Sequence, residues 1–116
     1  MTGDVTIWTN PRCSKCRGAE ALLTDAGVNV ERIRYLDDPP SRDEIVRVLA
    51  LTGETDPRTM MRTSEPLYRE LNLAQATASE LLDAMSQNPI LIERPIVIRK
   101  DQAVIARPPE LLLKLL

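Results

Sequence analysis

The change of periodicity along the first part of the chain constrains its fold more than any other feature. Val5–Trp8 is a short apolar run that indicates a strand. Apolar positions then recur at three- and four-residue steps, which predicts a helix that begins near Cys13 or Ser14 and ends at Gly27. Val30–Tyr35 alternates with period two and predicts a second strand. A strand, a helix and a strand in this order favour a parallel pair with a right-handed crossover.

The middle of the chain is predicted to be helical. Ser41 and Glu44 form a capping-box pattern, which indicates the start of a helix. Residues 78–87 repeat the helical spacing of apolar side chains. Between these two helices, the looser stretch 52–77 is predicted to hold short helical pieces.

The last third of the chain predicts a hairpin and a closing helix. Ile96–Arg99 and Ala103–Ala106 have strand patterns, a tight turn joins them, and Pro109–Leu116 follows as a helix. The order β-α-β, helices, β-β-α is the layout of an α/β thioredoxin-like fold with a mixed four-stranded sheet. We therefore expect a single domain over residues 1–116, with a helical insertion at about 41–88.

Composition limits the classes of partner. The formal net charge of −2 argues against nucleic acid as the main partner, because phosphate backbones favour a clearly basic surface. No apolar run approaches the ~18–20 residues that cross a bilayer, so no membrane is expected. The N-terminal residues lack the pattern of a secretory signal, and two cysteines are too few for a secreted disulfide scaffold. The sequence therefore predicts a cytoplasmic protein.

Both cysteines lie in a CxxC motif at the predicted start of the first helix. The chain has no histidine, so Cys13 and Cys16 lack the further ligands that a structural zinc site needs, and no metal is expected. Two inert buried thiols are the second alternative. The helix N-terminus and the nearby Arg12, Lys15 and Arg17 favour a third, because positive surroundings lower the pKa of a thiol. Cys16 is then either a resolving thiol or a small helix residue that happens to be cysteine.

Four segments, in order, carry a resemblance across nearly the whole chain. They are the N-P-x-C motif that ends at Cys13, the segment MRTSEPLYRELNL (Met61–Leu73), the segment NPILIERPIVI (Asn88–Ile98) and ARPPE (Ala106–Glu110). Together they resemble the glutaredoxin-linked arsenate reductases, which are thioredoxin-like. The resemblance implies that a cysteine thiolate attacks arsenate or a similar oxyanion, and that glutathione and glutaredoxin reduce the adduct. It implies no bound cofactor.

The resemblance also implies a role for individual residues. Cys13 matches the nucleophile of the family, and Arg62, Arg94 and Arg107 match its three oxyanion-binding arginines. Pro95 matches a position that is a cis-proline beside the active cysteine in thioredoxin-like proteins. Guanidinium groups suit this task, because their paired N–H donors match the geometry of an oxyanion.

Two departures from the family pattern leave other functions open. Thr9 stands where these reductases often carry histidine, and Cys16 stands where they often carry serine. A CxxC pair is typical of the related Spx-type regulators, which use it as a redox switch and bind RNA polymerase. It would also serve a general thiol-disulfide oxidoreductase, whose substrate is a protein or glutathione mixed disulfide. The electron donor of the reductase stays open between glutathione with glutaredoxin, thioredoxin and another thiol. Arg107 favours the oxyanion enzyme over the Spx type.

Overall fold

The computed structural model describes residues 4–116. Contacts within this part of the chain divide it into two compact units: residues 4–38 together with 94–116, and residues 39–93. The first unit holds the strands and both cysteines, and the second holds helices joined by short turns.

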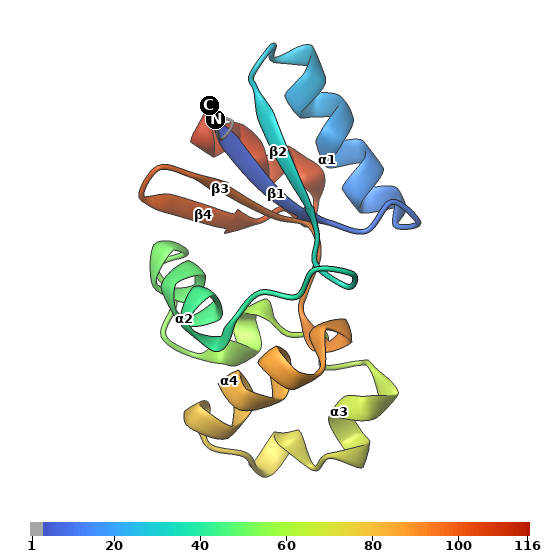
Figure 1. Cartoon of the computed structure of the whole chain (residues 1–116), viewed down its shortest axis with the longest axis vertical. Helices are drawn as coiled ribbons and strands as arrows, with labels where there is room; N and C mark the ends of the chain where they lie inside the picture. Colours follow the sequence, from blue (N-terminus) through green and yellow to red (C-terminus); the bar gives the residue numbers. More distant parts are fainter. Residues whose placement is uncertain (1–3) are drawn as a thin grey trace. The chain divides into compact units, whose positions relative to one another are not determined.

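The first unit is built on a mixed four-stranded sheet, as the sequence predicted (Figure 1). Its strands are β1 (Val5–Thr9), β2 (Val30–Arg34), β3 (Ile96–Arg99) and β4 (Gln102–Ile105), in the order β2-β1-β3-β4. The pair β1–β2 is parallel, and the pairs β1–β3 and β3–β4 are antiparallel. The carboxyl ends of β1, β2 and β4 and the amino end of β3 therefore meet at one edge of the sheet.

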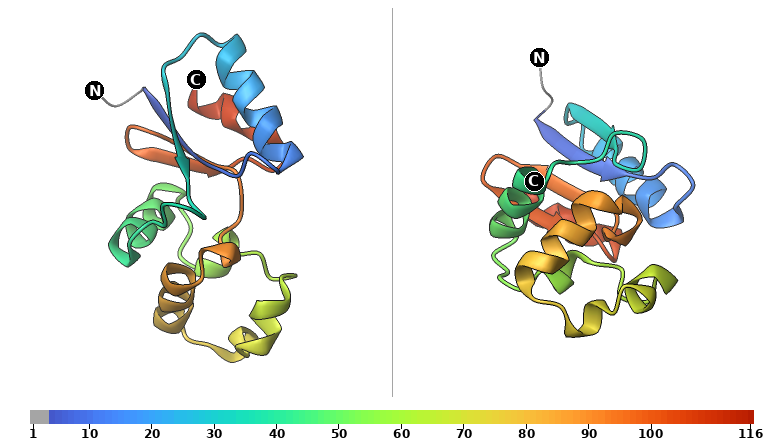
Figure 2. Two further views of the ribbon diagram at one scale, coloured as in Figure 1. Left: turned by 45° about the vertical axis from the view of Figure 1, so that its right-hand side comes forward. Right: turned by 60° about the horizontal axis from the view of Figure 1, so that its bottom comes forward.

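Two helical segments pack on the same face of this sheet, where Figure 2 shows them side by side. They are α1 (Ser14–Asp25) and η4 (Pro109–Leu115). The core between them and the sheet is aliphatic and includes Ile7, Leu23 and Val97. Fully burying one such side chain contributes roughly 1.5–3 kcal/mol.

The closing helix of the predicted β-β-α layout differs in its winding. η4 is a 3-10 helix instead of an α-helix. Side chains three apart eclipse one another in a 3-10 helix. This winding sends both Leu112 and Leu115 against the core. Helix α1 ends at Asp25, two residues before the predicted end, and Gly27 adopts a left-handed φ of 72° just beyond its C-cap residue.

The second unit is helical throughout. Its elements are α2 (Arg42–Leu51), η1 (Pro57–Met60), α3 (Pro66–Glu70), η2 (Leu73–Gln75), α4 (Ala78–Gln87) and η3 (Pro89–Leu91). Ser41 caps α2 by accepting the Glu44 N–H at 3.1 Å. A complete capping box, formed by Thr77 and Glu80, begins α4. Helices α2 and α4 pack against each other.

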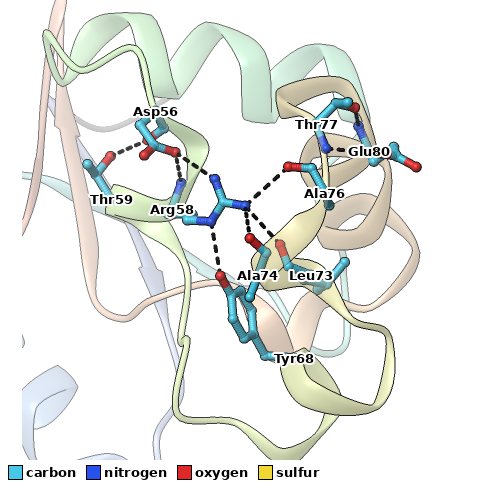
Figure 3. A network of polar contacts seen from close by, with 9 residues as sticks. All are labelled: Asp56, Arg58, Thr59, Tyr68, Leu73, Ala74, Ala76, Thr77 and Glu80. Carbon is cyan, nitrogen blue, oxygen red and sulfur yellow. Dashed lines mark hydrogen bonds and ion pairs between the residues drawn. The ribbon is translucent and has the colours of Figure 1, made fainter.

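Arg58 organises the turns of the second unit (Figure 3). Its Nε donates to the Tyr68 hydroxyl at 3.0 Å, and its Nη1 lies 3.7 Å from an Asp56 carboxylate oxygen. Its Nη2 donates to three backbone carbonyls, those of Leu73, Ala74 and Ala76. One guanidinium thus fixes the chain between η1 and the start of α4.

Candidate active site

A short loop places Cys13 at the start of α1. The loop leaves β1 after Thr9, and the Asn10 carbonyl accepts the Cys13 N–H at 2.9 Å. The Asn10 side-chain oxygen accepts the Arg12 N–H at 3.0 Å, which tightens the turn. Cys13 is the N-cap residue of α1. Its side chain therefore lies where the backbone N–H groups of the helix lack partners within the helix and the helix dipole is positive.

This position makes the Cys13 thiol acidic. Its pKa falls from the ordinary 9.0 to about 7, although burial, the largest single influence, acts to raise it. The backbone N–H of Cys16, the Arg94 guanidinium, the Cys16 thiol and the backbone N–H of Lys15 each lower it. A thiol with this pKa is substantially ionised at neutral pH, and the thiolate is the form that acts as nucleophile.

Arg94 contacts Cys13 from the segment that leads into β3. It stands two residues before β3, and the Arg94–Pro95 peptide bond is cis. Burial acts to lower the pKa of Arg94, but hydrogen bonds with Tyr35 and with Cys13 raise it above its ordinary value. The guanidinium is thus held as a cation beside the sulfur.

Arg107 lies next to Arg94 because of the hairpin. The Ala106 N–H donates to the Pro95 carbonyl at 2.9 Å, which continues the β3–β4 pairing beyond the strands. Arg107 Nη1 then donates to the Arg94 carbonyl at 2.9 Å. Two of the three predicted arginines therefore meet at the sheet edge that carries Cys13.

Tyr35 belongs to this site and was not singled out from the sequence. It follows β2 directly, it is fully buried, and it hydrogen-bonds with Arg94. A signal for it was present, because the predicted strand 30–35 ends in the one residue that combines an apolar ring with a polar tip. Since parallel strands end at the same edge of a sheet, this tip had to lie near the cysteine loop.

Cys16 lies one helical turn beyond Cys13 and is buried. The Asn10 N–H points at its Sγ from 3.4 Å. Burial is the main reason why the pKa of Cys16 is raised, and the neighbouring Cys13 adds to it, while contacts with Asn10 and Thr9 act in the opposite direction. The two thiols therefore differ: Cys13 ionises readily and Cys16 does not.

Arg62, the third predicted arginine, belongs to the second unit. Its N–H donates to the Leu91 carbonyl at 2.8 Å, beside the bridge between Met61 and Ile92. Its Nη1 lies 3.4 Å from a Glu65 carboxylate oxygen. The contacts described for Arg62 thus lie within residues 39–93.

A cavity of about 320 Å³ opens beside the cysteine loop in the first unit. It is lined by Thr9, Asn10, Pro11, Arg12, Arg34, Leu36 and Asp37. Two guanidinium groups and one carboxylate thus line it. Within residues 4–116, no cluster of histidine, cysteine and carboxylate side chains could hold a metal ion. In the same part of the chain, none of the helices has the length and apolar character that crossing a bilayer requires.

The fold and the site together define a thioredoxin-like protein in which an acidic cysteine is held against arginine. Residues 8–115 match the model of the ArsC family. The chain belongs to the ArsC family.

Named relatives and solved structures cover almost the whole chain. It is 44% identical over 114 residues to the arsenate reductase of Haemophilus influenzae, and the match covers 97% of this chain and 98% of that protein. It is 44% identical over 117 residues to the Escherichia coli protein named "Uncharacterized protein YfgD", and the match covers 99% of this chain and 98% of that protein. The structure of an arsenate reductase from Vibrio cholerae matches all of both chains with a TM-score of 0.95 and 43% identity.

Proposed function

We propose that this protein reduces arsenate and that the Cys13 thiolate is its nucleophile. The observation that carries the proposal is the Cys13 sulfur, which is acidified at the N-terminus of α1 and hydrogen-bonded to Arg94. A nucleophile that is already ionised needs no separate base. The names of the relatives from Haemophilus influenzae and Vibrio cholerae support arsenate as the substrate.

The arginines would bind the tetrahedral oxyanion. Arg94 lies beside Cys13, Arg107 donates to the Arg94 carbonyl, and the first N–H groups of α1 are further donors. Arg62 enters the proposal through its place in the sequence motif. Its participation requires that residues 1–116 form one thioredoxin-like domain with the helical insertion at about 41–88, and this is part of the proposal.

The reaction would proceed in two sulfur steps. The Cys13 thiolate attacks arsenic, a sulfur–arsenic bond forms, and one oxygen leaves as water after protonation. A second thiolate then attacks the Cys13 sulfur, the sulfur–arsenic bond breaks, and its electron pair stays on arsenic, which leaves as arsenite. The second thiol is either glutathione, with glutaredoxin restoring Cys13, or Cys16, with thioredoxin restoring the pair. Such thiol chemistry suits the reducing cytoplasm.

Arsenate turnover with separate electron donors tests this proposal. We expect the wild-type protein to turn over arsenate, and Cys13→Ser to lose turnover with every donor. Cys16→Ser separates the donors: it keeps turnover with glutathione and glutaredoxin if glutathione resolves the adduct, and loses it if Cys16 does. A folded wild-type protein that reduces no arsenate with either donor system would overturn the proposal.

A thiol-disulfide oxidoreductase is the second candidate, and one observation favours it. Cys16 is buried against Cys13, and a hydrogen bond joins the two thiols. Such an enzyme would reduce glutathione mixed disulfides without arsenate. Its activity would require Cys13 and would be insensitive to Arg107→Gln, whereas arsenate turnover would fall in that variant.

A further inference from the structure

Thr9 connects the second cysteine to a carboxylate. It is 3% exposed, and its hydroxyl donates to Glu20 Oε2 at 3.2 Å. The same side chain hydrogen-bonds with Cys16. The other carboxylate oxygen of Glu20 is paired with Arg32 on β2. A continuous polar chain therefore runs from the Cys16 sulfur through a hydroxyl to an ionised carboxylate, inside the first unit.

Two hydrogen-bonding groups lie at the Cys16 sulfur, although burial raises the pKa of this thiol in the resting protein. The Asn10 N–H points at it from 3.4 Å, and the Thr9 hydroxyl lies beside it. A buried thiol behaves as a small apolar side chain and needs no such donors, whereas a buried thiolate is costly without them. The donors would stabilise a negative sulfur during a reaction.

We propose that Glu20 takes the proton of Cys16 through the Thr9 hydroxyl, so that Cys16 can attack the sulfur of Cys13. This inference rests on the proposed function in the form in which Cys16 resolves the Cys13 adduct. Thr9 and Glu20 then serve the second half of the reaction, while Arg94 serves the first.

The proton and electron transfers balance as follows. The Cys16 S–H proton passes to Thr9 Oγ1, and the Thr9 hydroxyl proton passes to Glu20 Oε2. The Cys16 thiolate attacks Cys13 Sγ, the disulfide forms, and the bond between Cys13 and its adduct breaks. The electron pair of that bond leaves with the adduct, which is arsenite in the proposed reaction. The Thr9 hydroxyl can reverse its direction during the transfer, because a hydroxyl both donates and accepts.

Charged groups from β2, α1 and η4 surround Glu20. Arg32 lies opposite Ile7, and Arg34 lies opposite Thr9, in the register of β1 and β2. Cys16 faces Glu20 through Thr9 from its own helix. η4 packs on α1 at Gly18 and carries Glu110 and Lys114. The ion pair with Arg32 fixes the position of the Glu20 carboxylate beside the Thr9 hydroxyl.

A rapid-mixing experiment with the aromatic disulfide dithiobis(nitrobenzoate) tests the relay without arsenate. Excess protein reacts once through Cys13, which releases a coloured thiolate and leaves a mixed disulfide on Cys13. Attack by Cys16 then releases a second coloured thiolate in a unimolecular step. We expect Glu20→Gln and Thr9→Val to lower the ratio of the second rate constant to the first by about tenfold near neutral pH. This tenfold effect is smaller than the usual ~100-fold contribution of a general acid or base, because hydroxide in solution can also remove the Cys16 proton.

Three controls separate a proton relay from a purely structural tether. Asp25→Asn removes a carboxylate from the exposed end of the same helix and leaves the ratio unchanged. Thr9→Ser keeps a hydroxyl and restores the second step. Arg32→Met breaks the ion pair but leaves the hydroxyl and the carboxylate of the relay in place, so it keeps the ratio close to that of the wild type. A tether would instead make Arg32→Met and Glu20→Gln fall together.

The outcomes are distinct from those of the arsenate assay. In Cys16→Ser the second release disappears if Cys16 attacks Cys13. A second release in Glu20→Gln with the wild-type rate and pH dependence overturns the relay, and so does a second release that persists in Cys16→Ser. Neither result depends on whether the protein reduces arsenate.

Discussion

Arg94 in the first unit and Arg58 in the second are both half-buried, and each contacts a tyrosine, yet they do different work. Arg58 contacts Asp56 and Tyr68, but most of its bonds go to backbone carbonyls, which carry no titratable proton (Figure 3). Arg94 bonds to Tyr35 and to the Cys13 thiol, which ionises. The groups that an arginine contacts therefore indicate whether it supports the fold or takes part in the chemistry of a site, and its exposure does not.

The difference has a physical basis. A carbonyl acceptor gains the same bond at every pH, so Arg58 adds stability to the turns it joins. The Cys13 thiol accepts this bond more strongly after it loses its proton, so Arg94 lowers the pKa of Cys13. Substitutions at the two arginines should therefore separate activity from stability.

Loss of the nucleophile should have the largest effect. Cys13→Ser is expected to lower arsenate turnover by at least about a thousandfold, because a serine hydroxyl is not ionised near neutral pH. Steady-state turnover with saturating donor measures this. A Cys13→Ser protein that keeps more than a tenth of wild-type turnover would contradict the assignment of the nucleophile.

Loss of the arginine beside the thiol should come second. Arg94→Gln is expected to lower kcat/KM for arsenate by about 100-fold, because it removes both an oxyanion donor and the cation that stabilises the thiolate. Arg94→Lys should recover only part of this, since an ammonium group lacks the planar fork. The midpoint of urea unfolding should stay close to that of the wild type, and a large fall in that midpoint would show Arg94 to be structural.

The reverse pattern is expected at Arg58. Arg58→Met should lower the free energy of unfolding by about 2 kcal/mol, because several carbonyls lose a charged donor at once. The ionisation of Cys13 should not change. Arg47→Met is the matched control on an exposed part of α2 and should stay within about 0.5 kcal/mol of the wild type. Equal effects at Arg47 and Arg58 would contradict the role of the network in Figure 3.

The smallest effect is expected at the cap of α4. Thr77→Ala should lower the free energy of unfolding by about 1 kcal/mol, and Thr77→Ser should retain it. Hydrogen bonds from the backbone and side chain of Thr77 lower the pKa of Glu80. The Glu80 half of the capping box is therefore complete above the ordinary carboxyl pKa and weakens as the pH falls through the lowered one. The difference between Thr77→Ala and the wild type should shrink in acid but not vanish, because Thr77 Oγ1 still accepts the Glu80 N–H in the wild type. Urea unfolding at several pH values checks both statements.

The sequence predicted most of the fold because the pattern of each element is local. Helix 78–87 is confirmed at the same bounds, and the strand at residues 5–8 extends by one residue to Thr9. The hairpin strand predicted at 103–106 begins one residue earlier, at Gln102, because Lys100 adopts a left-handed φ of 56° and shortens the turn. The terminal segment is helical as predicted, but it is the 3-10 helix η4. In so short a segment the spacing of apolar residues does not distinguish a 3-10 helix from an α-helix.

The candidate site was only partly predictable, and the missing residues share a cause. Cys13, Arg94 and Arg107 stood in recognisable motifs. Tyr35 and Glu20 act through contacts with residues far away in the sequence, and neither lies in a motif that the resemblance covered. Parallel pairing of β1 and β2, and the packing of α1 on them, create these contacts. Strand order and register are therefore needed before such residues can be found.

The pH dependence of Cys13 alkylation by iodoacetamide tests the central claim most directly. The alkylation rate follows the thiolate fraction. The account predicts a midpoint near pH 7 for the wild type and a clearly higher midpoint for Arg94→Gln, because the lowered pKa of about 7 depends on that guanidinium. A wild-type midpoint near the ordinary 9.0, or an Arg94→Gln midpoint equal to that of the wild type, would contradict it.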